Sequence, residues 1–156
     1  MGSQQNRSGR CSCGSVQFDT TDRPLFRAYC HCSICQRYNG AAYADVTVFR
    51  AKSVAVVDES KISFKAYQQP PIVQRGTCIQ CGKPALEKIR LSLMPKLIVI
   101  PSGNFADKER LPTPSMHIFY DKRVQDMKDG IKKYEGYLAS QIGFSLALIK
   151  GMMSRS

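Results

Sequence analysis

Short stretches in which apolar and polar residues alternate run through most of the chain. Residues 16–18, 44–48 and 62–67 alternate in this way, and they are rich in β-branched and aromatic side chains. A period of two with such side chains is typical of strands that bury one face. Six further segments have the composition of strands: 26–29, 54–57, 73–77, 85–89, 96–100 and 116–120. Many short strands at regular intervals predict a mostly β, antiparallel domain with few short helices.

Turn-forming residues separate these segments, notably at 37–40, 69–71 and 102–104. Residues 1–9 are polar and basic, and we expect them to form a flexible leader. A chain of 156 residues suits one domain. We therefore expect a β domain over residues 10–136, which holds all the cysteines, and a helical extension over residues 137–156.

The pattern changes near the C-terminus from a period of two to the period of a helix. Ile142, Leu146 and Ile149 recur at helical spacing within residues 138–153, although Gly143 weakens a helix by about 1 kcal/mol relative to alanine. The segment is too short and interrupted to span a bilayer, which takes roughly 20 apolar residues. Two interpretations stay open. The helix docks on the β domain or on a second copy of the chain, or it attaches to a membrane surface.

Charge narrows the range of partners. The chain carries 23 lysines and arginines against 12 acidic residues, a formal charge of +11. The basic residues are scattered, with short doublets at Lys122-Arg123 and Lys132-Lys133 and no block of five. This distribution favours solubility and attraction of small anionic substrates over a nucleic-acid footprint, so we expect no stable nucleic-acid complex.

Four of the seven cysteines form two close pairs, Cys11 with Cys13 and Cys78 with Cys81. In an extended C-x-C the two side chains point the same way, and in C-x-x-C-G a tight turn at Gly82 lets both sulfurs converge. Two such pairs can supply a closed, tetrahedral structural zinc site. The alternative is four buried cysteines without a metal. Residues 1–10 carry no export signal, so we expect a reducing cytoplasm, in which close cysteines favour metals over disulfides.

The other three cysteines, Cys30, Cys32 and Cys35, lie within six residues and can form a local tripod around a second zinc. Three protein ligands and one open position are what a catalytic zinc uses. A closed site completed by His31, His117 or a partner chain is the alternative. In an open site, zinc lowers the pKa of a bound thiol or water, and an all-sulfur shell suits a thiol substrate.

Few other residues suggest chemistry. The chain has no Ser-His-Asp order, glycine-rich phosphate loop, H-E-x-x-H motif or zinc-deaminase signature. His117 lies on a predicted strand, where a histidine is either structural or part of a pocket lining. Arg37, next to the cysteine triplet, either binds a substrate carboxylate or is an ordinary surface arginine.

These motifs resemble those of the glutathione-dependent formaldehyde-activating enzyme family, which includes centromere protein V. The matching segments are C-S-C-G-S-V at 11–16, C-H-C-S-I-C-Q-R at 30–37, C-I-Q-C-G at 78–82, G-N-F at 103–105 and H-I-F at 117–119. The resemblance implies a zinc-stapled β-tent fold, with a structural zinc on Cys11, Cys13, Cys78 and Cys81 and a catalytic zinc on Cys30, Cys32 and Cys35. It also implies a carbon–sulfur lyase that joins formaldehyde and glutathione into S-hydroxymethylglutathione.

The chain departs from the family pattern in three places. Thr77 replaces a frequent aromatic residue, the tryptophan usual after H-I-F is missing, and the C-terminal helix is not a family feature. These differences leave the thiol and the aldehyde open. Two hypotheses follow: a zinc enzyme acting on aldehyde–thiol adducts, and a zinc-stabilised module that binds nucleic acid, cytoskeletal polymer or protein.

Overall fold

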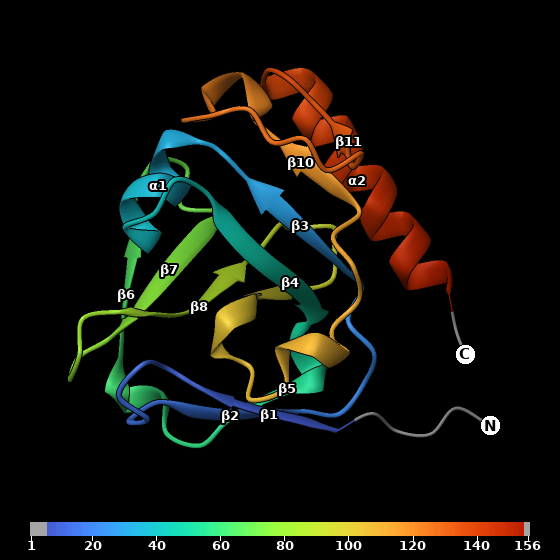
Figure 1. Cartoon of the computed structure of the whole chain (residues 1–156). Coiled ribbons are helices and arrows are strands. Elements are labelled where there is room, and N and C mark those ends of the chain that lie inside the picture. The colour runs from blue at the N-terminus through green and yellow to red at the C-terminus, as the bar shows by residue number, and fades with distance from the viewer. Residues whose placement is uncertain (1–5, 155–156) are drawn as a thin grey trace.

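An eight-stranded mixed sheet and a three-stranded sheet make up most of the protein (Figure 1). The computed structural model describes residues 6–154. The large sheet has the strand order β11-β10-β3-β4-β9-β8-β7-β6, and the small sheet has the order β1-β2-β5. The strands are β1 (Arg7–Arg10), β2 (Gln17–Thr20), β3 (Phe26–Cys30), β4 (Ala44–Arg50), β5 (Val54–Val56), β6 (Ile62–Ala66), β7 (Val73–Cys78), β8 (Pro84–Ile89), β9 (Leu97–Pro101), β10 (Met116–Ile118) and β11 (Lys132–Lys133). The helices are α1 (Ser33–Asn39) and α2 (Tyr137–Met153).

The mostly β architecture and the C-terminal helix are confirmed. Each of the nine predicted segments overlaps a strand, because period-two patterning matches the alternation of side chains across a sheet. Strand β1 was not predicted, and it occupies residues 7–10, at the end of the expected leader; residues 1–5 lie outside the described residues. The pairing is antiparallel except at one edge, where β10 runs parallel to both β3 and β11.

Two buried clusters lie on opposite faces of the central strands, and β9 shows why. Leu97 and Val99 belong to the cluster that packs against α2, whereas Ile98 and Ile100 belong to the cluster beneath the small sheet. Successive side chains of a strand point to opposite faces, so a strand that is apolar at every position can serve two cores. Each core contains members of one cysteine set, which fixes the two sets in different parts of the fold.

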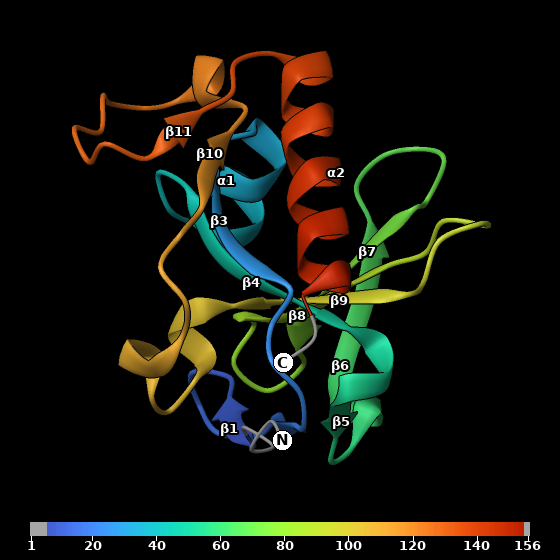
Figure 2. The ribbon, with the colours of Figure 1, turned by 90° about the vertical axis from the view of Figure 1, so that its right-hand side faces the viewer.

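Helix α2 lies along one side of the large sheet, as Figures 1 and 2 show from two directions. Its inner face packs through Phe144, whose ring meets that of Phe26 edge to face with centroids 5.1 Å apart, and through the buried Leu148. Gly143 allows a close approach, because a Cβ there would lie 2.7 Å from the ring of Tyr134. The glycine that weakens the isolated helix therefore serves its docking. Nowhere in residues 6–154 is a helix long and apolar enough to cross a membrane.

Two local predictions differ from the structure. The turn expected at 37–40 is the last turn of α1, which ends at Asn39 and is capped by Gly40 in the left-handed conformation. The strand expected over 116–120 ends at Ile118, because Phe119 adopts a positive φ of 54° and starts a short 3₁₀ turn. The N–H of Phe119 donates to the hydroxyl of Ser140 on α2, 2.7 Å away, which joins this bend to the helix.

Candidate metal centre

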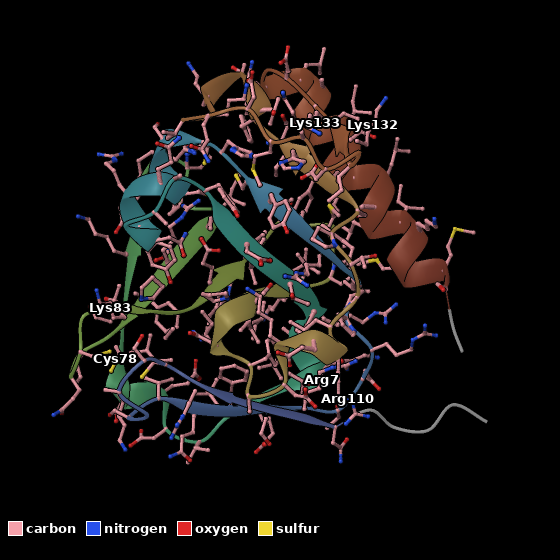
Figure 3. The ribbon with its side chains drawn as sticks, viewed as in Figure 1. Arg7, Cys78, Lys83, Arg110, Lys132 and Lys133 are labelled. Atoms are coloured by element: carbon pink, nitrogen blue, oxygen red, sulfur yellow. The ribbon has the colours of Figure 1, made fainter. Side chains whose placement is uncertain are left out.

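The sulfurs of Cys11, Cys13, Cys78 and Cys81 come together at one end of the molecule, within 4.8 Å of one another. Cys11 and Cys13 follow β1, and Cys78 ends β7 beside that turn (Figure 3). Gly82 has a φ of 71°, the left-handed conformation that the C-x-x-C-G turn was predicted to need. The spacing of the two pairs therefore did predict which residues converge.

This four-sulfur cluster fits a tetrahedral metal. Four sulfurs around a zinc ion at about 2.3 Å lie about 3.8 Å from each other. The Cys11–Cys13 and Cys13–Cys78 sulfurs are 3.7 and 3.8 Å apart. Backbone N–H groups of Ser15, Val16 and Gln80 each donate to a sulfur at 3.3–3.4 Å, as suits thiolate ligands.

Cys30, Cys32 and Cys35 form the second cluster, again within 4.8 Å of one another. Cys30 ends β3, Cys32 caps the start of α1, and Cys35 lies in its first turn. The Cys30 sulfur is 3.5 Å from that of Cys32 and 3.3 Å from that of Cys35. No histidine or carboxylate of residues 6–154 joins this group, so the donor set is three sulfurs.

Of the three cysteines, Cys32 is the one whose pKa is lowered. Hydrogen bonds from the Cys30 and Cys35 thiols, and from the Cys35 N–H at 3.3 Å, lower the pKa of Cys32 to about 3, although burial opposes the shift. The same side-chain hydrogen bonds raise the pKa of Cys35 above its ordinary value. Cys32 is also the most exposed of the three residues.

A buried ion pair lies against this cluster. Arg75 on β7 and Glu87 on β8 face each other across the antiparallel pair, with Nε and Oε1 2.8 Å apart. Arg75 also hydrogen-bonds the side chain of Cys35, and both Glu87 and Cys35 raise the guanidinium pKa against the effect of burial. Burial raises the pKa of Glu87 to about 7, and Arg75 limits that rise. The Arg75 guanidinium thus lies next to the sulfurs, and its ion pair with Glu87 fixes its position.

Aromatic residues link this ion pair to the helix that carries Cys35. The Tyr38 hydroxyl on α1 donates to the carbonyl oxygen of Gly76, which follows Arg75, at 2.5 Å. The Tyr67 ring lies 5.6 Å from the Arg75 guanidinium carbon and packs edge to face on Tyr38. These contacts tie α1 to β7, so the distance between the sulfurs and the guanidinium is set by the fold.

The two histidines of the chain form a hydrogen bond with each other next to this cluster, since His31 lies between Cys30 and Cys32. His31 Nε2 and His117 Nδ1 are 2.8 Å apart, and His117 Nε2 is 2.7 Å from a carboxylate oxygen of Asp129. A carboxylate only accepts, so His117 donates from Nε2 to Asp129. Burial and the nearby His117 and Arg123 lower the pKa of His31 to about 4, which keeps it neutral.

Comparison with known proteins identifies the family of the chain. Residues 6–122, which contain all seven cysteines, match the sequence profile of the glutathione-dependent formaldehyde-activating enzymes. The chain belongs to the glutathione-dependent formaldehyde-activating enzyme family. None of the curated proteins compared with it matches. Its fold is similar to that of a Rhodobacter sphaeroides protein of known crystal structure, with a TM-score of 0.51, 19% identity, and coverage of 64% of this chain and 87% of the other.

The structure shows where each of the predicted site residues lies. The structure brings the four and the three cysteines together in the two groups predicted from their spacing. His117 is fully buried against His31 and Asp129. Arg37 is exposed on α1, two residues after Cys35.

Three charged residues around the three-sulfur cluster were not predicted. Arg75 and Glu87 lie in strands that were predicted, but their juxtaposition depends on the register of β7 and β8. Asp129 lies beyond residue 122, where the match to the formaldehyde-activating family ends. A glutamate in the apolar run of β8 was the one available hint, because a buried charge needs a partner.

Proposed function

We propose that the protein is a zinc-dependent enzyme of the carbon–sulfur lyase type, which joins glutathione or a similar thiol to formaldehyde or a similar aldehyde. The observation that carries the proposal is the three-sulfur cluster, which lacks a fourth protein ligand among the described residues, in a member of this family. Zinc bound by three thiolates would offer an open position for a substrate and would lower the pKa of a thiol there.

Cys30, Cys32 and Cys35 would hold this zinc, and Arg75 would balance their charge. Three thiolates carry one more negative charge than zinc supplies in positive charge, and a substrate thiolate would add another. Arg75, buried beside Cys35 and fixed by Glu87, places a cation where that excess accumulates. We propose that this pair makes the anionic, substrate-bound state of the site accessible.

The remaining residues have positioning and binding roles in this proposal. His117 holds His31, and thereby the ligand loop between Cys30 and Cys32, so it acts without touching the substrate. Arg37 is exposed beside the cluster and is our candidate for holding a substrate carboxylate. In the reaction a sulfur–carbon bond forms, the carbonyl π bond breaks, and the thiol proton ends on the former carbonyl oxygen.

Magnetisation-exchange NMR on glutathione and formaldehyde tests the proposal. The wild-type protein should accelerate interconversion of the free thiol and the hydroxymethyl adduct. Cys32→Ser should return the rate to the uncatalysed value and reduce the zinc content from two ions to one. Ser33→Ala, an exposed change at the first residue of α1 and next to Cys32, should leave both unchanged. Equal rates with wild type, Cys32→Ser and no protein would refute the activity for this substrate pair.

The state of the cysteines supports a reducing environment. Each of the seven belongs to one of the two clusters that could hold a metal ion, and none forms a disulfide in the structure. We therefore propose that the protein works in the cytoplasm, where thiols stay reduced and available to metal.

A further inference from the structure

Helix α2 presents a row of apolar side chains to solvent. Leu138, Ile142, Leu146, Ile149 and Met153 follow each other at intervals of four, four, three and four residues, which places them on one side of the helix. Their side chains are between 49% and 78% exposed. Lys150 is the one charged residue between Tyr137 and Met153. A surface helix of a monomeric protein normally carries charged residues on this side.

This outer row is not needed to attach the helix to the domain. The inner face does so through Phe144, Leu148 and the close approaches of Gly143 and Gly151, the last of which lies against the backbone of Leu25. A helix that is apolar on both sides is typical of a buried position. Figures 1 and 2 show α2 at the edge of the molecule with its outer side uncovered.

We propose that the outer row of α2 pairs with the same row of a second copy, with the two helices antiparallel about a two-fold axis. A two-fold interface requires that one surface complement itself. Four of its five members meet this requirement, because they are symmetric about the point between Ser145 and Leu146, and the two copies of Leu146 would lie next to the axis at that point. Leu138 and Met153 are equally distant from that point, and so are Ile142 and Ile149. In an antiparallel pair, Leu138 therefore lies beside the partner's Met153, and Ile142 lies beside the partner's Ile149.

The charges also permit this pairing. Antiparallel helices place opposite ends of their dipoles together, which is favourable. Lys150 meets the partner's uncharged Gln141, and the two copies of Lys150 are about 13 Å apart along the axis at 1.5 Å per residue. That separation exceeds the screening length of about 8 Å at physiological salt. The positive charge of the chain, which lies mostly outside α2, therefore does not prevent the contact.

The size of the row sets the strength of the dimer. Helix α2 has 17 residues and is about 25 Å long. Two such helices in contact would bury on the order of 1,000 Å² in total, near the lower limit for a specific interface. We therefore expect a reversible dimer with a dissociation constant of roughly 1 to 100 µM rather than an obligate one.

Sedimentation velocity of the full chain over a range of concentrations tests the dimer. Ile142→Glu should weaken self-association by at least about 30-fold, because it buries an unpaired charge. Val57→Glu changes another exposed apolar residue, far from α2 in the sequence, and should have no effect. Zinc content and thermal unfolding should be unchanged in both variants. A wild-type chain that stays monomeric at the highest concentrations would overturn the proposal, as would dimers equally strong in all three proteins.

A mixing experiment tests the antiparallel register. Ile142→Glu and Ile149→Lys should each be monomeric alone and should form a heterodimer when mixed, because the new charges meet across the axis. Mixing Ile142→Glu with Ile142→Lys should give no such rescue. The reverse result would mean parallel helices and would refute this geometry. Monomers that sediment with vesicles of anionic lipid, without dimerising in solution, would assign the row to a membrane surface and refute the proposal.

Discussion

The two cysteine clusters differ in how the chain builds them and in what surrounds them. The four-sulfur cluster joins residues 65 positions apart, and backbone N–H groups are its main neighbours. The three-sulfur cluster lies within a loop and one helical turn, and a buried arginine, a buried glutamate and two bonded histidines surround it. The first closes a long loop of chain, whereas the second concentrates charge at a site with fewer ligands.

This difference indicates a division of labour. A metal on four ligands from distant segments contributes to folding, because the unfolded chain cannot hold those ligands together. A metal on three ligands from one local segment contributes less to folding, because β3 and α1 are adjacent in sequence with or without it. The proposed chemistry is therefore assigned to the cluster on which the fold depends least.

The largest expected effect is on the free energy of unfolding, when one sulfur is removed from each cluster in turn. Cys78→Ser should destabilise the protein by at least about 4 kcal/mol, since loss of a structural metal often prevents folding. Cys32→Ser should cost about 1 kcal/mol, since Cys30 and Cys35 stay in place. Urea unfolding with zinc analysis measures both. Cys78→His, a substitution that keeps a zinc ligand at the same position, should retain most of the stability that Cys78→Ser loses. Similar losses for both serine variants would remove the distinction between the clusters.

The next largest effect is expected in how easily a chelator removes metal from each cluster. A chelator should remove metal from the three-sulfur cluster at a concentration roughly tenfold lower than from the four-sulfur cluster, because one ligand fewer holds it. Native mass spectrometry during the titration should show a species with one zinc and native circular dichroism. Direct conversion from two zinc ions to none, without that species, would contradict the expectation.

The Arg75–Glu87 pair gives an intermediate effect that separates stability from site chemistry. Arg75→Met should cost about 3 kcal/mol, because it leaves Glu87 buried without its partner. The double variant Arg75→Met with Glu87→Leu should recover most of that loss, since apolar residues can replace a buried pair. Zinc affinity of the three-sulfur cluster should stay low in both variants if Arg75 balances the sulfur charge. Recovery of that affinity in the double variant would show that the pair is structural.

The sequence was sufficient for the two cysteine clusters and for most of the strands, for a common reason. Ligand spacing and period-two patterning are local properties, and local geometry decides whether Cys11 and Cys13, or Cys30 and Cys32, point the same way. Even β9, which is apolar at every position, was predicted from its length and composition. The C-terminal helix was predicted from its period, although the role of Gly143 became clear only from its contact with Tyr134.

What surrounds the ligands could not be predicted, because it depends on pairing between distant segments. Arg75 meets Glu87 through the register of β7 and β8, which includes an irregularity at Gly76 and Thr77. His117 reaches His31 because β10 runs parallel to β3 at the edge of the sheet, against the antiparallel expectation. Asp129 lies in an irregular segment between β10 and β11, and no motif singles it out. Composition does not encode any of these three contacts.

The smallest expected effect concerns Asp129 and acid. Although burial would raise it, hydrogen bonds from Lys133, the Ile131 N–H and His117 hold the pKa of Asp129 well below its ordinary value. A depressed carboxylate pKa stabilises the fold above the unfolded-state pKa of about 3.9, and this contribution is lost as pH falls further. Asp129→Asn should cost roughly 1 kcal/mol at pH 7.

The difference between wild type and Asp129→Asn should narrow below about pH 4, because the unfolded wild-type chain then gains a proton at Asp129 that the folded carboxylate does not yet bind. Thermal unfolding of both proteins between pH 3 and 7 measures this change. Asp126→Asn, an exposed carboxylate paired with Arg123, is the matched control and should shift stability little at any pH. A difference that stays constant over the whole range would mean that Asp129 supports His117 by shape alone, and that its charge does not stabilise the loop behind the three-sulfur cluster.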